Sequence, residues 1–380
     1  MHILIAPDKF KGSLTAAEAA SAMAEGALRV YPDAVVTQFP IADGGEGTLE
    51  AAVAAGYEER INAVVGPILQ PVGAAWAIRK SVDDGVTAVI ETAQASGLAH
   101  MEPAPENALR AHSYGCGQLI AAALDAGATE IVLGVGGSAM SDGGSGALRA
   151  LGLKPLDAAG NVVPLGGGSL SDVASLDVSG LDPRLSATKF RIAVDVRNPL
   201  YGSEGAAHVF GPQKGADADA VELLDAGLRN WASLLREATG QDVNVPGAGA
   251  AGGFPASFIA FAEATLEGGF ALVASLTGLP EQLLAADLVI TGEGSMDSQS
   301  LTGKAPIALA DSALERGIPV IVVAGRILVT PEELAGHGVV GAAQLLDVAE
   351  RKDGVPDVAD AVANAAKYLA LATSQVLEGA

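Results

Sequence analysis

The sequence lacks residues on which several familiar classes of protein depend. Its single cysteine, Cys116, excludes an internal disulfide framework and a four-cysteine metal site. The five histidines are scattered, and no two have the close spacing of a zinc site. Aromatic residues make up 4% of the chain, which is too few to favour a platform for stacking nucleic-acid bases. These absences direct attention to carboxylates, lysines and glycine-rich loops.

Basic side chains are also scarce. The chain has 22 lysines and arginines against 45 aspartates and glutamates, which gives a formal net charge of −23. This excess argues against a nucleic acid or an anionic membrane as the main partner. No uncharged apolar stretch is long enough to span a bilayer, and the apolar run at the N-terminus is too short for a signal peptide. We therefore expect a soluble, cytoplasmic protein, and the sequence leaves its oligomeric state open, a homo-oligomer included.

Familiar nucleotide-binding motifs are missing or incomplete. The segment Gly247–Gly252 matches the dinucleotide fingerprint by letter, but Pro246 precedes it, and Gly253 and Pro255 would interrupt a following helix. A Walker A loop is absent, because the Gly303-Lys304 pair lacks both the earlier glycine and the hydroxyl residue of that motif. Any nucleotide site in this chain must therefore be of another kind.

Apolar residues and glycine are abundant. A hydrophobic fraction of 49% over 380 residues is enough for a sizeable core, and the length suggests two or three domains or one domain with a large insertion. The 48 glycines are not periodic, and they cluster in loops between strand and helix segments. Glycines that cluster in such loops are typical of an α/β protein whose loops approach a ligand closely.

Both ends of the chain alternate between strand and helix patterns, as parallel sheets require. The N-terminal end predicts strands over residues 3–6 and 34–39 with a helix over 15–30 between them. The C-terminal end predicts strands over 287–291, 319–324 and 339–346, a helix over 306–316 and one final helix over 357–377. We expect the two ends to share one Rossmann-like sheet.

The middle of the chain has its own set of strands and helices, so we expect an inserted second α/β domain. Its predicted strands lie within residues 62–79, 86–92, 129–134 and 189–196, and its predicted helices lie over 118–126 and 217–238. The predicted fold is therefore α/β, with a Rossmann-like parallel-sheet domain over residues 1–62 and 282–380 and an inserted α/β domain over residues 63–281.

The first loop of interest follows the first predicted strand. Asp8, Lys9, Lys11 and Ser13 lead into a predicted helix N-terminus. Two lysines beside free helix N–H groups make a natural anion site. The competing interpretation is a solvated turn in which Ser13 caps the helix, and the residues alone leave both open.

Two further loops are rich in glycine. In Asp43-Gly44-Gly45-Glu46 the paired glycines let backbone N–H groups converge on a ligand, while the acids could hold a cation or a hydroxyl. The alternative is a tight turn whose acids face water. The loop over residues 134–146 follows a strand and precedes a helix, as a phosphate-binding turn would. Here the alternative is a tight connection in which glycine supplies a left-handed backbone conformation. Its candidate binding residues are Gly136, Gly137, Ser138 and Asp142.

Three later segments complete the set. Asp195 ends an apolar strand, where a carboxylate, if buried, is costly unless it has a partner or a task. Lys214 lies in a Gly-Pro turn that is ordinary when taken alone, and Glu293 and Lys304 lie in the loop after the strand over 287–291. The chain thus places four of its few lysines in such loops, as the local focusing of charge around an anionic ligand requires.

These segments together resemble the class I, or bacterial, glycerate kinases along essentially the whole chain. The resemblance is carried by residues 7–14, 40–48, 134–146, 195–200, 210–216, 246–253 and 291–304. Two departures are visible, because Lys9 replaces the usual serine and Met140-Ser141 replaces the usual Thr-Asn. Met140 cannot donate a hydroxyl hydrogen bond, so no role is expected of it.

The resemblance implies ATP-dependent phosphorylation of D-glycerate, in most members to 2-phosphoglycerate, and phosphoryl transfer calls for Mg²⁺. We expect Asp8, Lys11, Asp43, Asp195 and Lys304 to converge in one groove between the two domains. Asp195, Lys11 and Lys304 are the expected catalytic residues, and Asp43 and Asp142 the expected metal ligands. Asp195 would orient the acceptor hydroxyl as a base or hold the metal. Expected substrate or nucleotide contacts are Asp8, Ser13, Asp43, Gly44, Gly45, Glu46, Gly136, Gly137, Ser138, Asp142, Lys214 and Glu293.

Two other functions stay open at this point. The protein could phosphorylate a different small hydroxy acid, or it could be a non-catalytic sensor that binds a phosphorylated metabolite on the same loops. The acids favour an enzyme, because a sensor of anions gains nothing from Asp43, Asp142 and Asp195 beside its ligand.

Overall fold

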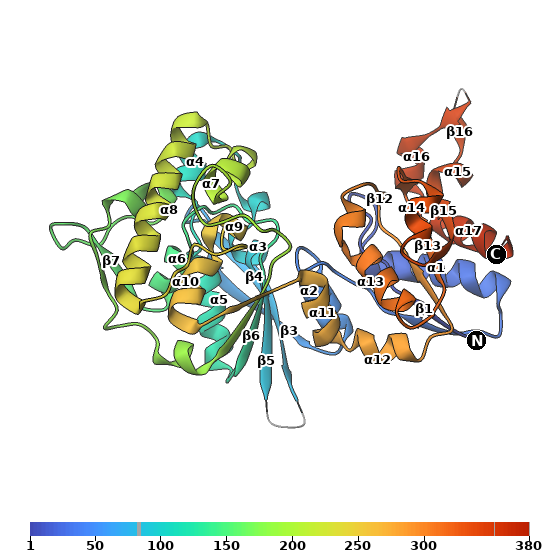
Figure 1. Cartoon of the computed structure of the whole chain (residues 1–380), viewed down its shortest axis with the longest axis horizontal. Coiled ribbons are helices and arrows are strands. Elements are labelled where there is room, and N and C mark those ends of the chain that lie inside the picture. Colours follow the sequence, from blue (N-terminus) through green and yellow to red (C-terminus); the bar gives the residue numbers. More distant parts are fainter. Residues whose placement is uncertain (82–84, 353, 380) are drawn as a thin grey trace. The chain divides into compact units, whose positions relative to one another are not determined.

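The structure is a computed structural model, and it describes residues 1–81, 85–352 and 354–379 (Figure 1). Contacts within the chain define two compact units, which we call unit 1 and unit 2 and describe separately. Unit 1 combines Met1–Asp43 with Phe270–Ala380, and unit 2 is Gly44–Gly269. Both units are mixed α/β structures, as the sequence predicts.

Unit 1 contains a five-stranded sheet in which all neighbouring strands are parallel. Its strands, in spatial order, are β2 (Val35–Gln38), β1 (His2–Ile5), β11 (Leu288–Thr291), β13 (Val320–Ala324) and β15 (Val339–Gln344). The chain therefore moves outward from β1 to β2 and then returns to the other side of β1. The strand order reverses between β1 and β11, and such a switch point is where open α/β sheets bind ligands.

Helices cover both faces of the unit 1 sheet (Figure 1). Ile3 and Ile5 of β1 pack in one core with α1 and α17, whereas Leu4 packs in a second core with α12 and α13, because successive strand side chains point to opposite faces. The helices of this unit are α1 (Ala16–Val30), α11 (Gly269–Thr277), which starts at the last residue of unit 2, α12 (Leu279–Leu284), α13 (Ala305–Leu314), α14 (Pro331–Ala335), α15 (Leu345–Val348), α16 (Val358–Ala363) and α17 (Ala365–Glu378). Its short strands are β12 (Ser295–Met296), β14 (Arg326–Ile327), β16 (Arg351–Lys352) and β17 (Val355–Pro356).

The final helix differs from the prediction. The sequence predicts one helix over residues 357–377, but the structure has α16 and α17, which are separated at Asn364. The Asn364 side chain donates to Asp360 Oδ1 at 2.7 Å, and its backbone leaves the helical region. Asparagine competes with the helix for backbone-like hydrogen bonds, which explains a break that apolar periodicity does not reveal.

Unit 2 contains a six-stranded mixed sheet. Its strands, in spatial order, are β10 (Thr265–Glu267), β9 (Lys189–Ala193), β6 (Glu130–Gly134), β5 (Val86–Glu91), β4 (Pro71–Lys80) and β3 (Glu58–Val65). The pairs from β10 to β5 are parallel, and β4 and β3 are antiparallel additions. A separate pair is formed by β7 (Lys154–Leu156) and β8 (Ser175–Asp177).

The helices of unit 2 enclose a single large apolar core. They are α2 (Thr48–Ala54), α3 (Thr92–Ser96), α4 (Pro105–Arg110), α5 (Tyr114–Asp125), α6 (Ser145–Ala150), α7 (Ala206–Phe210), α8 (Ala218–Thr239), α9 (Ala250–Gly253) and α10 (Pro255–Ala262). The long helix α8 begins at Asp217, whose side chain accepts from the Ala220 N–H at 2.9 Å, as the sequence suggests.

The unit boundaries lie elsewhere than the sequence predicts. The predicted boundary after residue 62 would cut β3, but β3 pairs along its whole length with β4 of unit 2. The predicted boundary after residue 281 would divide α12, whose Leu279 and Leu283 both belong to a core of unit 1. The divisions at 43/44 and 269/270 respect both the sheet and that core.

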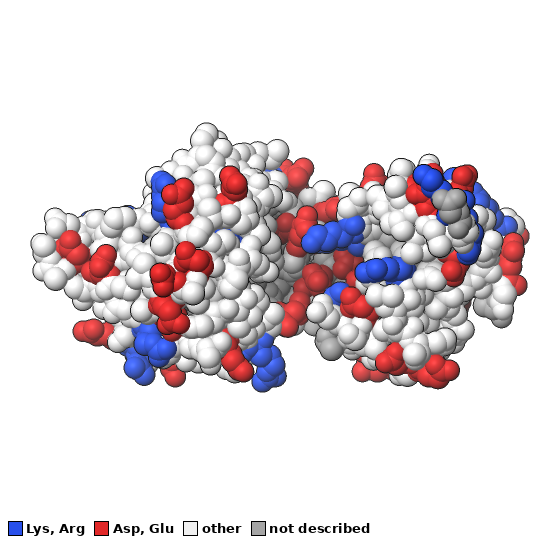
Figure 2. All heavy atoms as spheres, turned by 90° about the horizontal axis from the view of Figure 1, so that it is seen from above, with Lys and Arg blue, Asp and Glu red and all other residues white. Residues whose placement is uncertain are grey.

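The distribution of charged side chains on the surface follows from the acidic composition of the chain. In Figure 2 acidic side chains are spread over the visible face of both units, while basic side chains form only small groups. In the described part of the chain, no helix has both the length and the apolar character needed to cross a membrane.

Candidate functional site

The loops at the switch point of unit 1 are joined by hydrogen bonds at the carboxyl ends of three strands. The Asp8 N–H, after β1, donates to the Gly292 carbonyl oxygen at 2.9 Å, after β11. The Gly325 N–H, after β13, donates to the Glu293 carbonyl oxygen at 3.0 Å. Gly292 permits this close approach, since an added Cβ would overlap the carbonyl oxygen of Val323.

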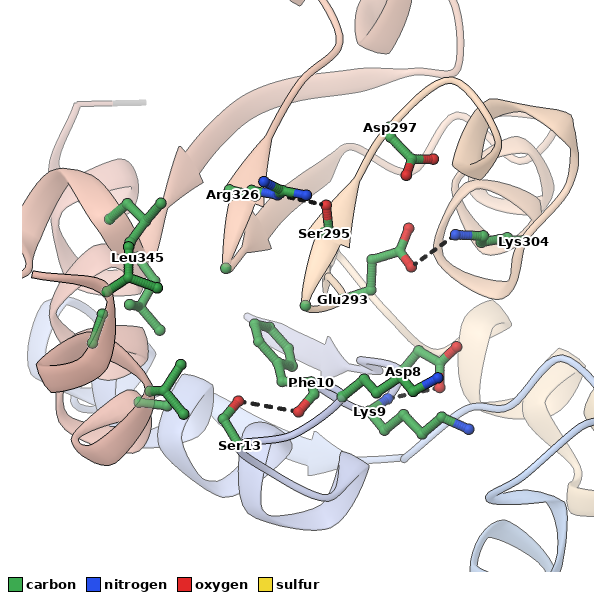
Figure 3. A pocket seen from close by; sticks show the side chains of 18 of the residues that line it. Asp8, Lys9, Phe10, Ser13, Glu293, Ser295, Asp297, Lys304, Arg326 and Leu345 are labelled. Carbon is green, nitrogen blue, oxygen red and sulfur yellow. Dashed lines mark hydrogen bonds and ion pairs between the residues drawn. The ribbon is translucent and has the colours of Figure 1, made fainter. Parts of the chain in front are cut away.

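These loops border a cavity of about 520 Å³, which we call the switch-point pocket (Figure 3). Its volume is within the range of small-molecule sites. All of its lining residues belong to unit 1. Six of the expected catalytic and binding residues lie in it, namely Asp8, Lys11, Ser13, Asp43, Glu293 and Lys304.

Asp8 is a buried carboxylate in this pocket, with 8% of its surface exposed. Burial, together with the negative charge of Asp43, raises the pKa of Asp8 to about 7, although Lys9 opposes the rise. One Asp8 oxygen accepts from the Lys9 N–H at 2.7 Å. Near neutral pH this carboxyl group therefore exchanges its proton readily.

Glu293 and Lys304 form an ion pair at the same end of the pocket, with 3.7 Å between Oε2 and Nζ (Figure 3). The other oxygen of Glu293, Oε1, is buried and has no hydrogen-bond partner within the described part of the chain. Burial raises the pKa of Glu293, while the Ser300 hydroxyl and Lys304 oppose this rise. A buried acceptor without a partner is costly, so this oxygen is available to a ligand.

The loop between β1 and α1 resolves the question of the helix cap. Thr15, not Ser13, is the N-cap of α1, and it forms a capping box with Glu18. The Ser13 hydroxyl donates to the Phe10 carbonyl oxygen at 3.0 Å, so it stabilises the loop itself. Lys11 is exposed at the pocket rim.

A second group of predicted residues lies at the carboxyl edge of the unit 2 sheet, after β6 and β9 and before α2. The group comprises Gly44, Gly45, Glu46, Gly136, Gly137, Ser138 and Asp195. Gly45 lies against Gly136, so closely that a Cβ on Gly136 would come within 2.7 Å of the Gly45 Cα. Asp195 Oδ1 accepts from the Gly269 N–H at 2.8 Å. The two glycine-rich loops and Asp195 therefore form one backbone-rich edge.

Glu91 supports this edge and was not singled out by the sequence. One carboxylate oxygen, Oε1, accepts from the Gly47 N–H at 3.0 Å and from the Leu49 N–H at 2.8 Å. It serves as a cap for α2, whose own N-cap residue, Gly47, has no side chain. The available signal was an acid at the end of an apolar strand, a position that Asp195 also occupies.

Two predicted ligand-binding residues are interior residues instead. Asp142 has no exposed surface, and its carboxylate accepts four hydrogen bonds. Those donors belong to Ser113, Gly144 and Gly146, at the N-termini of α5 and α6, where the helix dipoles favour a negative charge. With its oxygens so occupied, Asp142 is a structural residue, and we do not retain it as a metal or nucleotide ligand.

Lys214 is the second interior residue. It is 2% exposed, and its Nζ donates to the Met140 carbonyl oxygen at 2.6 Å. Burial lowers the pKa of Lys214 to about 8, while Asp142 opposes the shift. Lys214 thus holds the loop over residues 134–146 from the inside, in place of the predicted contact with an anion.

The sequence also missed part of the pocket wall. Arg326 follows the buried strand β13, and its Nε donates to the Ser295 hydroxyl at 3.0 Å. The loop after β13 could have been recognised, because it follows a third apolar strand of the same parallel sheet. The apolar side chains contributed by α15, α16 and α17 carry no local signal of a site.

The structure can also be compared with the predicted metal site. Among the described residues, no group of three or more histidines, cysteines, aspartates or glutamates is arranged to hold a metal ion. The expected convergence of Asp8, Lys11, Asp43, Lys304 and Asp195 in one groove stays a prediction, because Asp195 belongs to unit 2 and the others to unit 1.

Fold and site together define a class of protein. The chain is a two-unit α/β protein with a charged small-molecule pocket at the switch point of a parallel sheet and a glycine-rich edge on a second sheet. The sequence profile of the glycerate kinase family matches residues 3–379, and the chain belongs to that family.

Individual relatives agree with this assignment over most of their length. The glycerate 2-kinase of Escherichia coli K12 is 46% identical over 341 residues, which is 89% of each chain. A Bacillus subtilis glycerate kinase is 44% identical over 372 residues, or 97% of this chain and 95% of the relative. A Salmonella typhimurium LT2 crystal structure assigned as glycerate kinase 2 superposes with a TM-score of 0.86 at 42% identity, covering 100% of this chain and 98% of that one.

Proposed function

We propose that this protein is an ATP-dependent glycerate 2-kinase, which transfers the terminal phosphoryl group of ATP to the C2 hydroxyl of D-glycerate. The match to the family over residues 3–379 is the observation that carries the proposal. The switch-point pocket adds independent support, because it combines lysines and carboxylates in one small-molecule cavity. Phosphoryl transfer depends on positioning and charge stabilisation, which these residue types supply.

Four charged residues of the pocket have proposed tasks. Lys11 and Lys304 stabilise the charge on the phosphoryl group as it transfers, since a positioned cation is most effective where charge develops. Glu293 positions Lys304 through their ion pair. The Asp8 carboxyl group, with a pKa of about 7, can take or return a proton near neutral pH.

The carboxylates of the pocket fit a magnesium ion that is bound together with ATP. Mg²⁺ in phosphoryl-transfer sites is held by one or two carboxylates, with the phosphate oxygens and water completing its coordination. Asp43 and Glu293 are the proposed ligands, because both line the pocket and Glu293 Oε1 is buried without a partner. When bound, the ion would neutralise phosphate charge and orient the phosphoryl group.

Asp195 is the proposed orienting residue for the acceptor hydroxyl. It is exposed at the carboxyl edge of the unit 2 sheet, and the Gly269 N–H fixes one of its oxygens at 2.8 Å. The glycine-rich backbone beside it supplies N–H groups for an anionic acid. We propose that this edge and the switch-point pocket act on the same pair of substrates.

A direct assay tests the reaction. Purified protein is incubated with MgATP and D-glycerate, and the release of ADP is followed with a coupled assay. We expect release with D-glycerate and much less with L-glycerate. Release with another hydroxy acid, but not with D-glycerate, would assign a different acceptor. No release with any hydroxy acid would contradict the kinase proposal and favour a sensor.

A further inference from the structure

The switch-point pocket has two chemically different ends (Figure 3). Charged side chains, among them Asp8, Lys9, Glu293 and Lys304, gather at one end. Leu345 lies at the opposite end, and the Phe10 ring lies between the two ends. The proposed function gives the pocket a charged task and leaves its apolar end unexplained.

The apolar end is formed by the C-terminal helices α15, α16 and α17. We call it the apolar wall, and it consists of Leu345, Leu346, Val358, Ala361, Val362 and Ala365. Val358 is 59% exposed and Val362 is 48% exposed, although both line a cavity. Exposed apolar side chains that are scattered singly need no explanation, but a group that shares one pocket with charged loops indicates a binding surface.

The charged end matches an anion. Lys9, Lys11, Lys304 and Arg326 line the pocket, and Arg326 is held by its hydrogen bond to Ser295. The buried and unpartnered Glu293 Oε1 lies in the same region, where a cation that accompanies an anionic ligand would satisfy it. The pocket lining holds four basic and four acidic side chains, whereas the whole chain has 22 basic and 45 acidic ones, so basic side chains are locally enriched here.

The two proposed substrates differ in how they fit such a pocket. Glycerate is small and polar throughout, so it has nothing to place against an apolar wall. A nucleoside triphosphate has a flat, largely apolar base at one end and a row of phosphates at the other, and ligand pockets are commonly apolar with a few placed polar groups. We propose that the switch-point pocket is the nucleotide site, with the base on the apolar wall and the phosphates at Lys11 and Lys304.

This inference rests on the proposed function but makes a separate claim, because it states which substrate this pocket holds and in which direction. It also identifies α16 as a determinant of nucleotide affinity. Val358 and Val362 make no contribution to phosphoryl transfer in this arrangement. Changes at these positions should therefore affect the binding of ATP and leave the binding of D-glycerate unchanged.

The variant Val362→Asp tests the apolar wall. The side chain is exposed, so the substitution should not impair folding, and it places a carboxylate against the base. We expect Kd for ATP, measured by calorimetry on the full chain, to rise about tenfold or more, which corresponds to about 1.4 kcal/mol. KM for D-glycerate should stay within about twofold of the wild type, since the pocket does not hold it. Leu314→Asp is the matched control, because Leu314 is also 48% exposed on a helix of unit 1 and lies outside the pocket.

Two partial ligands separate the ends of the pocket. Adenosine carries the base without phosphate, and inorganic tripolyphosphate carries the phosphate without the base. Val362→Asp should weaken adenosine binding more than tripolyphosphate binding. Lys304→Met should weaken tripolyphosphate binding and leave adenosine binding unchanged. These opposite effects of the two variants would establish both the site and the direction of the nucleotide.

Three results would overturn the inference. In the first, Val362→Asp raises KM for D-glycerate and leaves ATP binding unchanged, so the wall faces the acceptor. In the second, Val362→Asp and Leu314→Asp both behave as the wild type, so the wall belongs to no substrate site. In the third, Val362→Asp and Lys304→Met each weaken the binding of adenosine and of tripolyphosphate to the same extent. Because binding is measured without turnover, these outcomes remain distinct from failure of the kinase proposal, in which no hydroxy acid releases ADP.

Discussion

Lys304 is the residue at which a chemical role and a structural role can be separated most simply. Lys304→Met keeps most of the side-chain volume and removes the charge that faces Glu293. If Lys304 stabilises the transferring phosphoryl group, kcat/KM should fall by about 10²-fold or more, as when one strong transition-state donor is lost. Some loss of melting temperature is expected beside this, because the variant leaves the buried Glu293 carboxylate without its cation.

A matched control exists for this variant. Lys154 pairs with Asp177 at the same separation, 3.7 Å, on the surface of unit 2. Lys154→Met should retain the kinetics of the wild type. A large loss of stability in Lys304→Met, with normal activity in the folded fraction, would instead give Lys304 a structural role.

Asp195 can be tested by a change that keeps its shape. Asp195→Asn retains an oxygen that can accept from the Gly269 N–H and loses the negative charge. If the carboxylate orients the acceptor hydroxyl, kcat should fall by about 10²-fold or more while Kd for ATP stays near normal. Weaker Mg²⁺ binding with partial rescue at high Mg²⁺ would indicate a metal ligand. A kcat close to that of the wild type would exclude both roles.

Asp8 makes stability depend on pH in a predictable direction. Its folded-state pKa is raised to about 7, so between about pH 4 and pH 7 the folded protein holds a proton that the unfolded chain has released. The free energy of unfolding therefore falls as the pH rises through this window. In urea titrations, the free energy of unfolding of Asp8→Asn should fall less between pH 5 and pH 8 than that of the wild type. The difference should be on the order of 2 kcal/mol. Asp33→Asn, at an exposed position of unit 1, should parallel the wild type.

The roles of single residues were the hardest feature to predict from the sequence. Asp142 and Lys214 have the composition of ligand-binding residues, yet both are buried and hold the loop over residues 134–146 in place. A carboxylate that accepts bonds from two helix N-termini cannot be distinguished by sequence from one that accepts a ligand, because both sites use backbone N–H groups. Asp8 and Glu293, by contrast, line the switch-point pocket, and their contacts with a substrate or nucleotide stay predictions.

At the scale of elements, α2 depends on a side chain that is distant in sequence. Glu91→Leu would leave the Gly47 and Leu49 N–H groups without their acceptor. We expect the free energy of unfolding to fall by about 1–3 kcal/mol, the usual cost of buried donors without a partner. Glu91→Gln keeps an acceptor oxygen and should cost less. Equal losses in both variants, measured by urea unfolding, would show that the charge and not the cap is responsible.

The strands and helices were predictable to different extents. Strands such as β1, β11 and β13 follow from short apolar runs bounded by polar loops, because each is buried on both faces of a parallel sheet. The helix α1 was predictable from the spacing of its alanine and leucine residues, whereas its capping box at Thr15 and Glu18 was found only in the structure. The break at Asn364 and the pairing of β3 depend on side-chain competition and on a strand partner, and neither leaves a periodic signal.

At the scale of the whole molecule, the sheet order accounts for the position of the site. Residues near both ends of the chain meet in unit 1, because β1 and β11 are neighbours although their sequences are far apart. A sequence can indicate which loops carry chemistry, but it cannot reveal that α15, α16 and α17 complete the same pocket. That information depends on the packing of α17 with α1 against the sheet.

The structure of the product tests the central claim most directly. The protein is incubated with MgATP and D-glycerate, and the product is identified by phosphorus and proton NMR through its phosphorus–proton coupling. We predict a phosphate ester on C2, with ADP formed in equal amount. An ester on C3 would contradict the proposed regiochemistry, and the absence of any phosphorylated glycerate would contradict the account as a whole.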